Sequence, residues 1–209
     1  MNLKQKAQKI YGELQKCYPG AECALDSNGD PFKLLVMAIL SAQCTDKRVN
    51  EVSKDLFDAL PDAKAFAASK PGELETLIHS VGLYNAKAKN LRAASKMLVE
   101  EYGGALPSDM DDLLRLPGVG RKVANLLRGD IFGLGGIVAD THCIRICHRL
   151  GFTDKADPIV TEKTMQDMIP TEDQSAFCHL LVTFGREICT ARAPKCADCP
   201  IAQYCDKII

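Results

Sequence analysis

The sequence predicts an all-α fold, and three observations lead to this prediction. Apolar residues recur at helical spacing along nearly every periodic segment of the 209-residue chain. The only strand-like piece, residues 137–138, is too short to build a sheet. No low-complexity segment and no solenoid-type repeat is present, and the apolar content is ample for the core of one domain or of two small ones.

The first half of the chain is expected to contain three main helices. Residues 34–40 are the longest apolar stretch, far shorter than a membrane span, and are predicted as a fully buried helix bounded by Pro31 and Ser41. Residues 46–60 and 84–102 are predicted as the next two helices. The apolar face of the first of these consists of Val49, Val52, Leu56, Phe57 and Leu60.

The second half continues the helical pattern. Residues 108–115 are predicted as a short helix whose first turn is capped by Ser108. The Asp111 side chain, three residues later, is expected to accept from the Ser108 N–H and so complete a capping box. Further helices are predicted at residues 121–131, 161–169 and 174–188. The last of them is expected to turn Phe177, Leu180, Leu181 and Phe184 inward.

A tight glycine hairpin, Leu116-Pro-Gly-Val-Gly-Arg-Lys122, separates the helices at 108–115 and 121–131. Gly118 and Gly120 lack a Cβ, so backbone N–H groups there can approach a nucleic-acid phosphate closely. The following helix adds its positive N-terminal end at the same place. The alternative is an ordinary connection between helices, because Pro-Gly and Gly-x-Gly occur in many turns.

Lys122, at the start of that helix, is the candidate nucleophile. A lysine is unusual there because the helix dipole disfavours a cation. If its pocket is also dry, the neighbouring Arg121 and the dipole should lower the pKa of the amine. A lowered pKa turns an inert ammonium into a nucleophile.

Four of the ten cysteines fall within seventeen residues, with the spacing C-x6-C-x2-C-x5-C. They are Cys189, Cys196, Cys199 and Cys205. Thiolates this dense can converge on one metal centre, and the spacing alone leaves zinc and an iron–sulfur cluster open. Disulfides are the less favoured reading, because the N-terminal residues 1–10 lack the apolar core of a signal peptide. The other six cysteines are expected to be small buried hydrophobes in a reduced compartment.

The net charge is −1, which argues against strong non-specific DNA binding by the chain as a whole. Two segments nevertheless carry four cations each and no carboxylate, residues 84–99 and residues 115–128. They flank the hairpin and resemble part of the basic surface with which a protein binds a polyanion, which we call the basic footprint. Most such runs of lysine and arginine are, however, solvated helix faces.

Asp140 precedes a further helical pattern. Asp is a preferred N-cap, so capping is the simpler interpretation of this residue. A catalytic role would require the carboxylate to lie near the amine, where it could accept a proton or stabilise a cation developing on a sugar.

The hairpin at 116–122, the segment Val138-Ala-Asp-Thr-His142 and the cysteines at 6-2-5 spacing together resemble endonuclease III, of the helix-hairpin-helix DNA glycosylase superfamily. Residues 40–46 (Leu-Ser-Ala-Gln-Cys-Thr-Asp) and 81–85 (Val-Gly-Leu-Tyr-Asn) extend the likeness in order over essentially the whole chain.

This resemblance implies two helical domains with a DNA cleft between them. One is a helical barrel domain carrying the helix-hairpin-helix at residues 24–134, and the other is a cluster domain of residues 1–23 and 135–209. It implies a [4Fe–4S] cluster on the four cysteines, Lys122 as the nucleophile and Asp140 as the essential carboxylate. The implied DNA contacts are Gln43 and Leu83, which wedge into the duplex, the hairpin residues Gly118, Val119, Gly120 and Arg121, and Arg192 and Lys195 in the cluster loop.

The implied function is base excision repair. The protein would be a glycosylase that removes oxidised or damaged pyrimidines from duplex DNA and nicks the abasic site by β-elimination through a lysine Schiff base. Two alternatives remain, an adenine glycosylase of the same superfamily and a non-catalytic helix-hairpin-helix module with a zinc knot. Presence of Lys122, which adenine glycosylases lack, disfavours the first. The implied setting is the bacterial cytoplasm at the nucleoid, as a monomer without a signal peptide or membrane association.

Overall fold

The computed structural model describes residues 1–207, and within them every regular element is a helix, as the sequence predicts. None of the described helices is long and apolar enough to cross a membrane. The chain divides into two compact units. We call residues 24–132 the central unit, and residues 1–23 with the chain from Gly133 onward the terminal unit.

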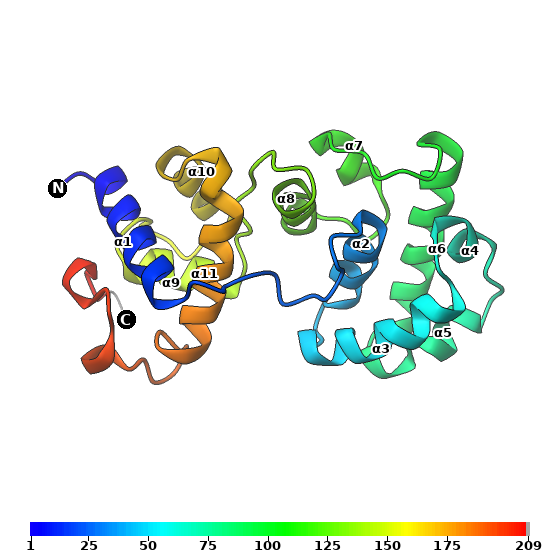
Figure 1. The fold of residues 1–209 in the computed structure, drawn as a ribbon, viewed down its shortest axis with the longest axis horizontal. Helices are drawn as coiled ribbons and strands as arrows, with labels where there is room; N and C mark the ends of the chain where they lie inside the picture. Colours follow the sequence, from blue (N-terminus) through cyan, green and yellow to red (C-terminus); the bar gives the residue numbers. More distant parts are fainter. Residues whose placement is uncertain (208–209) are drawn as a thin grey trace. The chain divides into compact units, whose positions relative to one another are not determined.

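The central unit contains seven α-helices and one short 3₁₀-helix (Figure 1). They are α2 (Pro31–Leu40), α3 (Asp46–Ala59), α4 (Ala63–Ala68), α5 (Glu73–Leu77), η1 (His79–Val81), α6 (Tyr84–Glu101), α7 (Met110–Arg115) and α8 (Arg121–Asp130). The helices predicted at 46–60, 84–102 and 121–131 are each present to within one residue. The short helices α4 and α5 carry too few turns to show a periodic pattern and were not predicted.

The core of the central unit forms around α2 and α6. Every residue from Leu34 to Leu40 is buried, which confirms the fully buried helix predicted there. Asp30 caps its first turn by accepting from the Lys33 N–H, and Pro31 occupies the first helical position, where its missing N–H costs nothing. Helix α6 packs against α4, α5 and α2, and α8 packs against α7 and α2. These contacts hold the hairpin between α7 and α8 on a fixed support.

The start of α7 differs from the prediction. The helix begins at Met110, and its cap is Asp109, whose Oδ1 accepts from the N–H groups of Asp111 and Asp112 at 2.8 and 3.3 Å. Ser108 therefore lies one residue before the cap, and the predicted capping box with Asp111 is wrong. Asp and Ser are about equally good caps, so the sequence pattern alone could not choose between adjacent candidates.

Up to residue 207, the terminal unit is built from four α-helices and three 3₁₀-helices; its α-helices are labelled in Figure 1. They are α1 (Leu3–Cys17), α9 (Thr141–Arg149), α10 (Pro158–Met168), η2 (Thr171–Asp173), α11 (Gln174–Glu187), η3 (Cys196–Asp198) and η4 (Ala202–Tyr204). Helices α1 and α9 each pack against α10 and α11. The predicted inward residues of α11, Phe177, Leu180, Leu181 and Phe184, are all buried.

One prediction in this unit needs correction. Helix α10 starts at Pro158, three residues before the predicted Thr161, because Asp157 caps it and Pro158 takes the first position. Ile159 and Val160 in its first turn are exposed, so the apolar pattern detected only the part of the helix that is buried. The strand-like residues 137–138 build no sheet, as predicted; both are buried, and the Val138 N–H donates to the Cys178 Sγ at 3.2 Å.

Candidate active site and iron–sulfur site

The hairpin between α7 and α8 is shaped by Gly118. Its φ is +87°, in the region that favours glycine, and a Cβ there would lie 3.1 Å from the Cβ of Asn90 on α6. The turn closes with a hydrogen bond from the Val119 N–H to the Leu116 carbonyl at 3.0 Å. Val119 is buried, so it anchors the hairpin while Gly118 and Gly120 stay exposed. Glycine at position 118 is therefore required by both backbone conformation and packing.

Gly120 has a different role, because its φ of −104° is open to any residue and a Cβ there would meet no atom within 4 Å. It is the N-cap of α8, and no side chain of the described residues caps that helix. The N–H groups of the first turn thus face outward with the helix dipole behind them. This is the arrangement in which helix N-termini bind phosphate.

Lys122 is the second residue of α8, immediately after the hairpin and Arg121. Both side chains are exposed. The described residues therefore do not form the dry pocket around Lys122 that the sequence analysis made a condition for activation. Exclusion of water from this amine would have to come from a bound ligand.

Gln43 and Leu83 lie in two other loops of the central unit, after α2 and after η1. Both side chains are exposed. Both residues also have positive φ, +55° at Gln43 and +48° at Leu83, a conformation that non-glycine residues rarely adopt. The sequence analysis named these residues from family likeness alone, and no sequence signal pointed to their backbone conformation.

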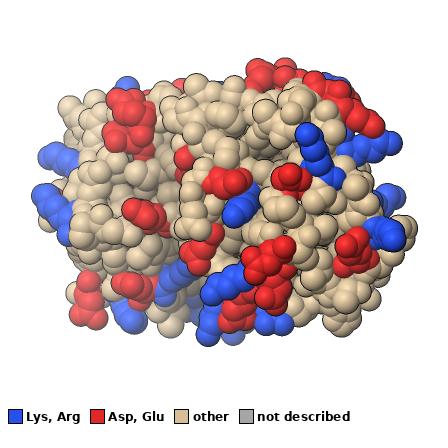
Figure 2. Space-filling model, turned by 45° about the vertical axis from the view of Figure 1, so that its right-hand side comes forward, with Lys and Arg blue, Asp and Glu red and all other residues tan. Residues whose placement is uncertain are grey.

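The predicted basic footprint is partly neutralised. Three of its eight cations pair with glutamates of the same unit: Arg92 with Glu75 at 3.1 Å, Lys96 with Glu100 at 3.8 Å and Arg115 with Glu101 at 2.5 Å. Lys87, counted in the same footprint, is buried. The sequence pattern failed because the partner acids lie just outside the acid-free segments or come from a neighbouring helix. On the face drawn in Figure 2, acidic and basic side chains are accordingly interspersed.

Asp140 belongs to the terminal unit and is the N-cap of α9. Its Oδ1 accepts from the His142 and Cys143 N–H groups at 2.9 and 2.7 Å, which fixes the carboxylate at the positive end of the helix. The capping interpretation of this residue is thus correct. Because a single oxygen takes both bonds, capping leaves the second carboxylate oxygen available for another task.

The segment before Asp140 is held against the start of α11. The Gly136 N–H donates to the Gln174 side chain at 3.0 Å. Gly135 has a φ of +73°, and a Cβ there would come within 2.5 Å of the Thr171 side chain. These contacts fix the approach of the chain to Asp140 and hence the position of its carboxylate.

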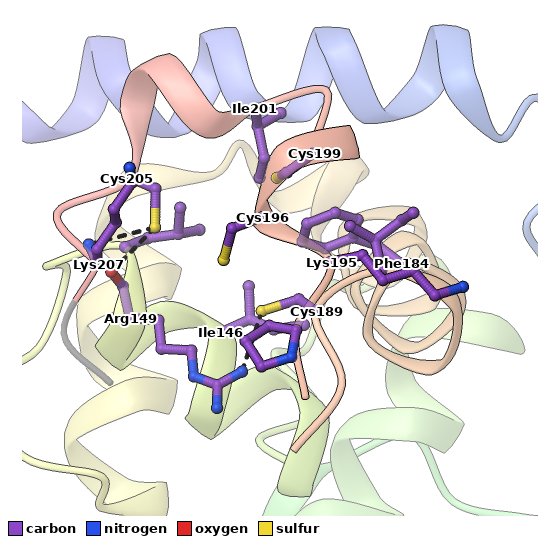
Figure 3. A pocket seen from close by; sticks show the side chains of 13 residues that line it. Ile146, Arg149, Phe184, Cys189, Lys195, Cys196, Cys199, Ile201, Cys205 and Lys207 are labelled. Carbon is purple, nitrogen blue, oxygen red and sulfur yellow. Dashed lines mark hydrogen bonds between the residues drawn. The ribbon is translucent and has the colours of Figure 1, made fainter. Parts of the chain in front are cut away.

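Cys189, Cys196, Cys199 and Cys205 line one pocket of the terminal unit, and Figure 3 shows their side chains grouped around it. Apolar side chains, among them Ile146, Leu150 and Phe184, also line it, together with the cationic Arg149, Lys195 and Lys207. Burial raises the pKa of the Cys199 thiol, and the charges of the other three sulfurs raise it further. Four convergent cysteine sulfurs are the donor set that an iron–sulfur cluster requires, and a cationic centre would hold even Cys199 as a thiolate, so these residues fit such a cluster.

Arg149, buried at the end of α9, supports the first ligand and the loop after it (Figure 3). Its Nη1 donates to the Cys189 Sγ at 3.4 Å and to the Thr190 carbonyl at 2.7 Å, and its Nη2 donates to the Ala191 carbonyl at 2.9 Å. The loop between Cys189 and Cys196 is thereby fixed to the helix. Arg192 and Lys195 in this loop are exposed.

The remaining six cysteines only partly match the expectation of burial. Cys143, Cys147 and Cys178 are buried, whereas Cys23 and Cys44 are half-buried and Cys17 is exposed. Cysteine type alone does not report burial, since Cys17 occupies the last turn of α1, where the apolar face has ended.

Comparison with known proteins identifies the family of the chain. Residues 36–171 match the family model of the HhH-GPD superfamily base excision DNA repair protein, and residues 189–205 match that of the iron-sulfur binding domain of endonuclease III. Endonuclease III of Synechocystis sp. is 46% identical over 203 residues, which cover 97% of this chain and 92% of the relative.

Two solved structures are similar over nearly their full length. A non-covalent endonuclease III–DNA complex has a TM-score of 0.92 and 41% identity, covering 99% of this chain and 97% of that chain. A trapped endonuclease III–DNA covalent intermediate, in an estranged-adenine complex, has a TM-score of 0.91 at the same identity and coverage.

The fold and the site thus define a base excision repair protein of the HhH-GPD superfamily. Within that superfamily, the chain belongs to the endonuclease III family. It is a DNA glycosylase with associated abasic-site lyase activity, and its cofactor is a [4Fe–4S] cluster. This assignment is favoured over both alternatives, the adenine glycosylase and the non-catalytic module with a zinc knot.

Proposed function

We propose that this protein binds duplex DNA, releases a damaged pyrimidine and nicks the abasic site through a Schiff base on Lys122. The observation that carries the proposal is the position of Lys122. Its exposed amine lies two residues after Gly120, at the start of helix α8, whose first N–H groups have no side-chain cap among the described residues. A phosphate held by the N–H groups of Gly118, Gly120 and Arg121, around the buried Val119 whose own N–H closes the turn, would bring the neighbouring deoxyribose to this amine. A relative of 41% identity has been trapped in a covalent complex with DNA, which supports a covalent route.

The reaction begins with extrusion of the damaged nucleotide, because a stacked base cannot be reached. Gln43 and Leu83 would enter the vacated space and offset part of the unstacking cost, which is a few kcal/mol per step. A lesion that pairs or stacks poorly is cheaper to extrude, and this contributes to selectivity.

The neutral Lys122 amine then attacks C1′ of the deoxyribose, and the bond from C1′ to the base breaks with the electron pair leaving on the base. Opening of the sugar ring gives a protonated Schiff base between Nζ and C1′. The iminium acidifies C2′, loss of a C2′ proton forms a double bond to C3′, and the 3′-phosphate departs with the C3′–O electron pair. Water hydrolyses the Schiff base and restores the amine.

Asp140 would act as a carboxylate throughout. Its negative charge stabilises the positive charge that develops on the sugar, and its free oxygen can take the proton of the attacking amine. The two N–H groups that α9 donates to it keep the carboxylate in one orientation during these steps.

The cluster would bind Cys189, Cys196, Cys199 and Cys205 and supplies a structural clip with no redox step in this reaction. Arg149 and the cluster ligands on either side fix the intervening loop, and its Arg192 and Lys195 would contact DNA phosphates. We further propose that residues 24–134 and the rest of the chain act as two domains that both bind DNA, with the protein working as a monomer at the nucleoid.

Borohydride trapping tests the proposed nucleophile. The reagent reduces the Schiff base, so incubation with an abasic duplex should yield a covalent complex that Lys122→Gln does not form while still binding the duplex. The control is Lys54→Gln, the same change at an exposed lysine of α3, which should be trapped like the unmodified protein. Trapping of Lys122→Gln at the normal rate would exclude Lys122 as the nucleophile.

A panel of duplexes, each with one modified base, tests the substrate class. Base release and strand nicking are scored separately. Release of oxidised pyrimidines but not of oxidised purines is the expected result, and the opposite preference would overturn the proposed substrate.

A further inference from the structure

Lys87, in the second turn of α6, is a buried lysine that the mechanism does not use. The whole residue is only 4% exposed. Its Nζ donates to the Leu40 carbonyl at 2.8 Å and to the Val81 carbonyl at 2.9 Å. No carboxylate of the described residues pairs with it. Burial lowers the pKa of this ammonium. Burying a cation without a carboxylate partner costs desolvation free energy. An apolar side chain would avoid this cost, so the two hydrogen bonds of Lys87 indicate a role that an apolar side chain would not fill.

The two carbonyls belong to segments far apart in the sequence. Leu40 is the last residue of α2, and Gln43 follows three residues later. Val81 is the last residue of η1, and Leu83 follows two residues later. The Lys87 ammonium therefore links, by hydrogen bonds, the starts of the two loops that carry the exposed Gln43 and Leu83.

The backbone of each loop is strained at the exposed residue, Gln43 in one and Leu83 in the other. Among the described residues, only Asn28, Gln43, Leu83 and Lys207 have positive φ without being glycine. Such a conformation costs about 1–3 kcal/mol at a non-glycine residue and persists only where the surroundings enforce it. Leu83 is 56% exposed, so burial of its own side chain does not supply the enforcement. The bonds from Lys87 lie at the nearest buried points of the two loops.

We propose that Lys87 is a positioning residue that fixes the spacing of Gln43 and Leu83, so that both side chains enter the duplex together where a nucleotide is extruded. The proposal rests on the wedge role given to these two residues under the proposed function. Lys87 touches neither the DNA nor the reacting atoms. It acts through the two backbone segments that it joins.

The test compares Lys87→Met with the unmodified holoprotein. Methionine keeps the length and the apolar part of the side chain but donates no hydrogen bond. Lys96→Met is the matched control, because it makes the same change at an exposed position of the same helix. The probe is a duplex with a tetrahydrofuran abasic analogue opposite aminopurine, and an undamaged duplex of the same sequence is the reference.

Two quantities are measured. The first is the ratio of the dissociation constants for the two duplexes, which we expect Lys87→Met to reduce about tenfold or more, because part of the offset to unstacking is lost. The second is the aminopurine fluorescence at saturating protein, which reports unstacking inside the complex and should fall in Lys87→Met but not in Lys96→Met. A merely destabilised protein would bind both duplexes less well and leave the saturated signal unchanged. An unchanged ratio and signal in folded Lys87→Met overturn the proposal.

If Lys87→Met does not fold, Lys87→Arg decides. Its wider planar fork leaves neither carbonyl unsatisfied but alters the spacing between the two loops. A reduced ratio then supports the proposal, and an unchanged ratio overturns it. Gln43→Ala and Leu83→Ala separate this outcome from the proposed function. If these two variants keep full lesion preference, the wedge role itself is wrong, whereas loss of preference in them but not in Lys87→Met contradicts only the role of Lys87.

Discussion

The guanidinium of Arg149 lies within hydrogen-bond distance of the Cys189 Sγ, at 3.4 Å, and at the same time holds the two carbonyls that follow this cysteine. The Cys205 Sγ lies 3.3 Å from the Arg149 carbonyl. One residue of α9 therefore contacts the first and the last of the four proposed ligands. Helix α9, which Asp140 caps at its start, ends at this contact, so the carboxylate and the cluster site are attached to the same helix.

Replacement of Arg149 should loosen the cluster and the loop together. In Arg149→Met, the carbonyls of residues 190 and 191 lose their donors, and each such hydrogen bond contributes about 0.5–1.5 kcal/mol or more, since the donor is charged. We expect less iron per protein, faster loss of the visible cluster absorption under a chelator, and weaker DNA binding. Lys155→Met, at an exposed position of the same unit, is the control. Full iron content and normal chelator resistance in Arg149→Met would contradict this role.

Two substitutions of Asp140 separate its structural role from its proposed chemical one. Asn is as good an N-cap as Asp, so Asp140→Asn should leave the free energy of unfolding nearly unchanged, whereas Asp140→Ala should lower it by about 1 kcal/mol. Both variants should lose base release by about 100-fold or more, since each lacks the carboxylate. Denaturant unfolding and single-turnover base release measure the two effects. Normal base release by Asp140→Asn would show that Asp140 only caps α9.

The sequence predicted the elements that carry a long, one-sided apolar pattern. Helices α3, α6, α8 and α11 were placed to within one residue because burial of one face dictates their composition. The start of α10 was missed because Ile159 and Val160 point to solvent, where no pattern is required. The choice between Ser108 and Asp109 as a cap depends on one peptide unit of backbone geometry, and both residues suit the position.

The candidate site shows the same limit. The spacing of the cysteines and glycines was sufficient to identify local features, the metal-binding group and the hairpin. Long-range partners were not predictable, because the glutamates that neutralise Arg92 and Arg115 lie in other elements. Lys87 looked like a surface cation in the sequence, and only its two carbonyl partners reveal it as an internal tie.

Gly118 and Gly120 should respond differently to the same substitution. Gly118→Ala places a Cβ 3.1 Å from Asn90 at a φ of +87°, so we expect it to lower the free energy of unfolding by about 1–2 kcal/mol. Gly120→Ala meets no atom within 4 Å, and its unfolding free energy should stay within about 1 kcal/mol of the original.

The DNA affinity of the Gly120→Ala variant should nevertheless fall, because its methyl group would lie where a phosphate approaches the N–H groups of the hairpin. Thermal unfolding and duplex binding at one fixed salt concentration test the pair. Unchanged affinity in Gly120→Ala would argue against phosphate binding at this hairpin.

Ionisation of Tyr11 should make the stability of the terminal unit fall at alkaline pH. Burial raises the pKa of Tyr11 from 10.0 to about 12, and the hydrogen bond from its hydroxyl to the Asp173 Oδ1, at 2.9 Å, adds to the rise together with the charge of Asp173. Because the folded pKa is raised, the stabilisation is fully present below pH 10 and is lost as the pH rises toward 12.

Tyr11→Phe should therefore lower the free energy of unfolding at neutral pH by about 1 kcal/mol and show a smaller loss of stability above pH 10 than the unmodified protein. In Asp173→Asn most of the alkaline loss should remain, since burial is the largest cause of the raised pKa. Urea unfolding midpoints of the three proteins at a series of alkaline pH values provide the measurement. Tyr18, whose pKa is also raised to about 12, is present in all three, so differences between them report on Tyr11 alone. Identical pH profiles for Tyr11→Phe and the unmodified protein would mean that this hydroxyl ionises as freely in the folded chain as in the unfolded one.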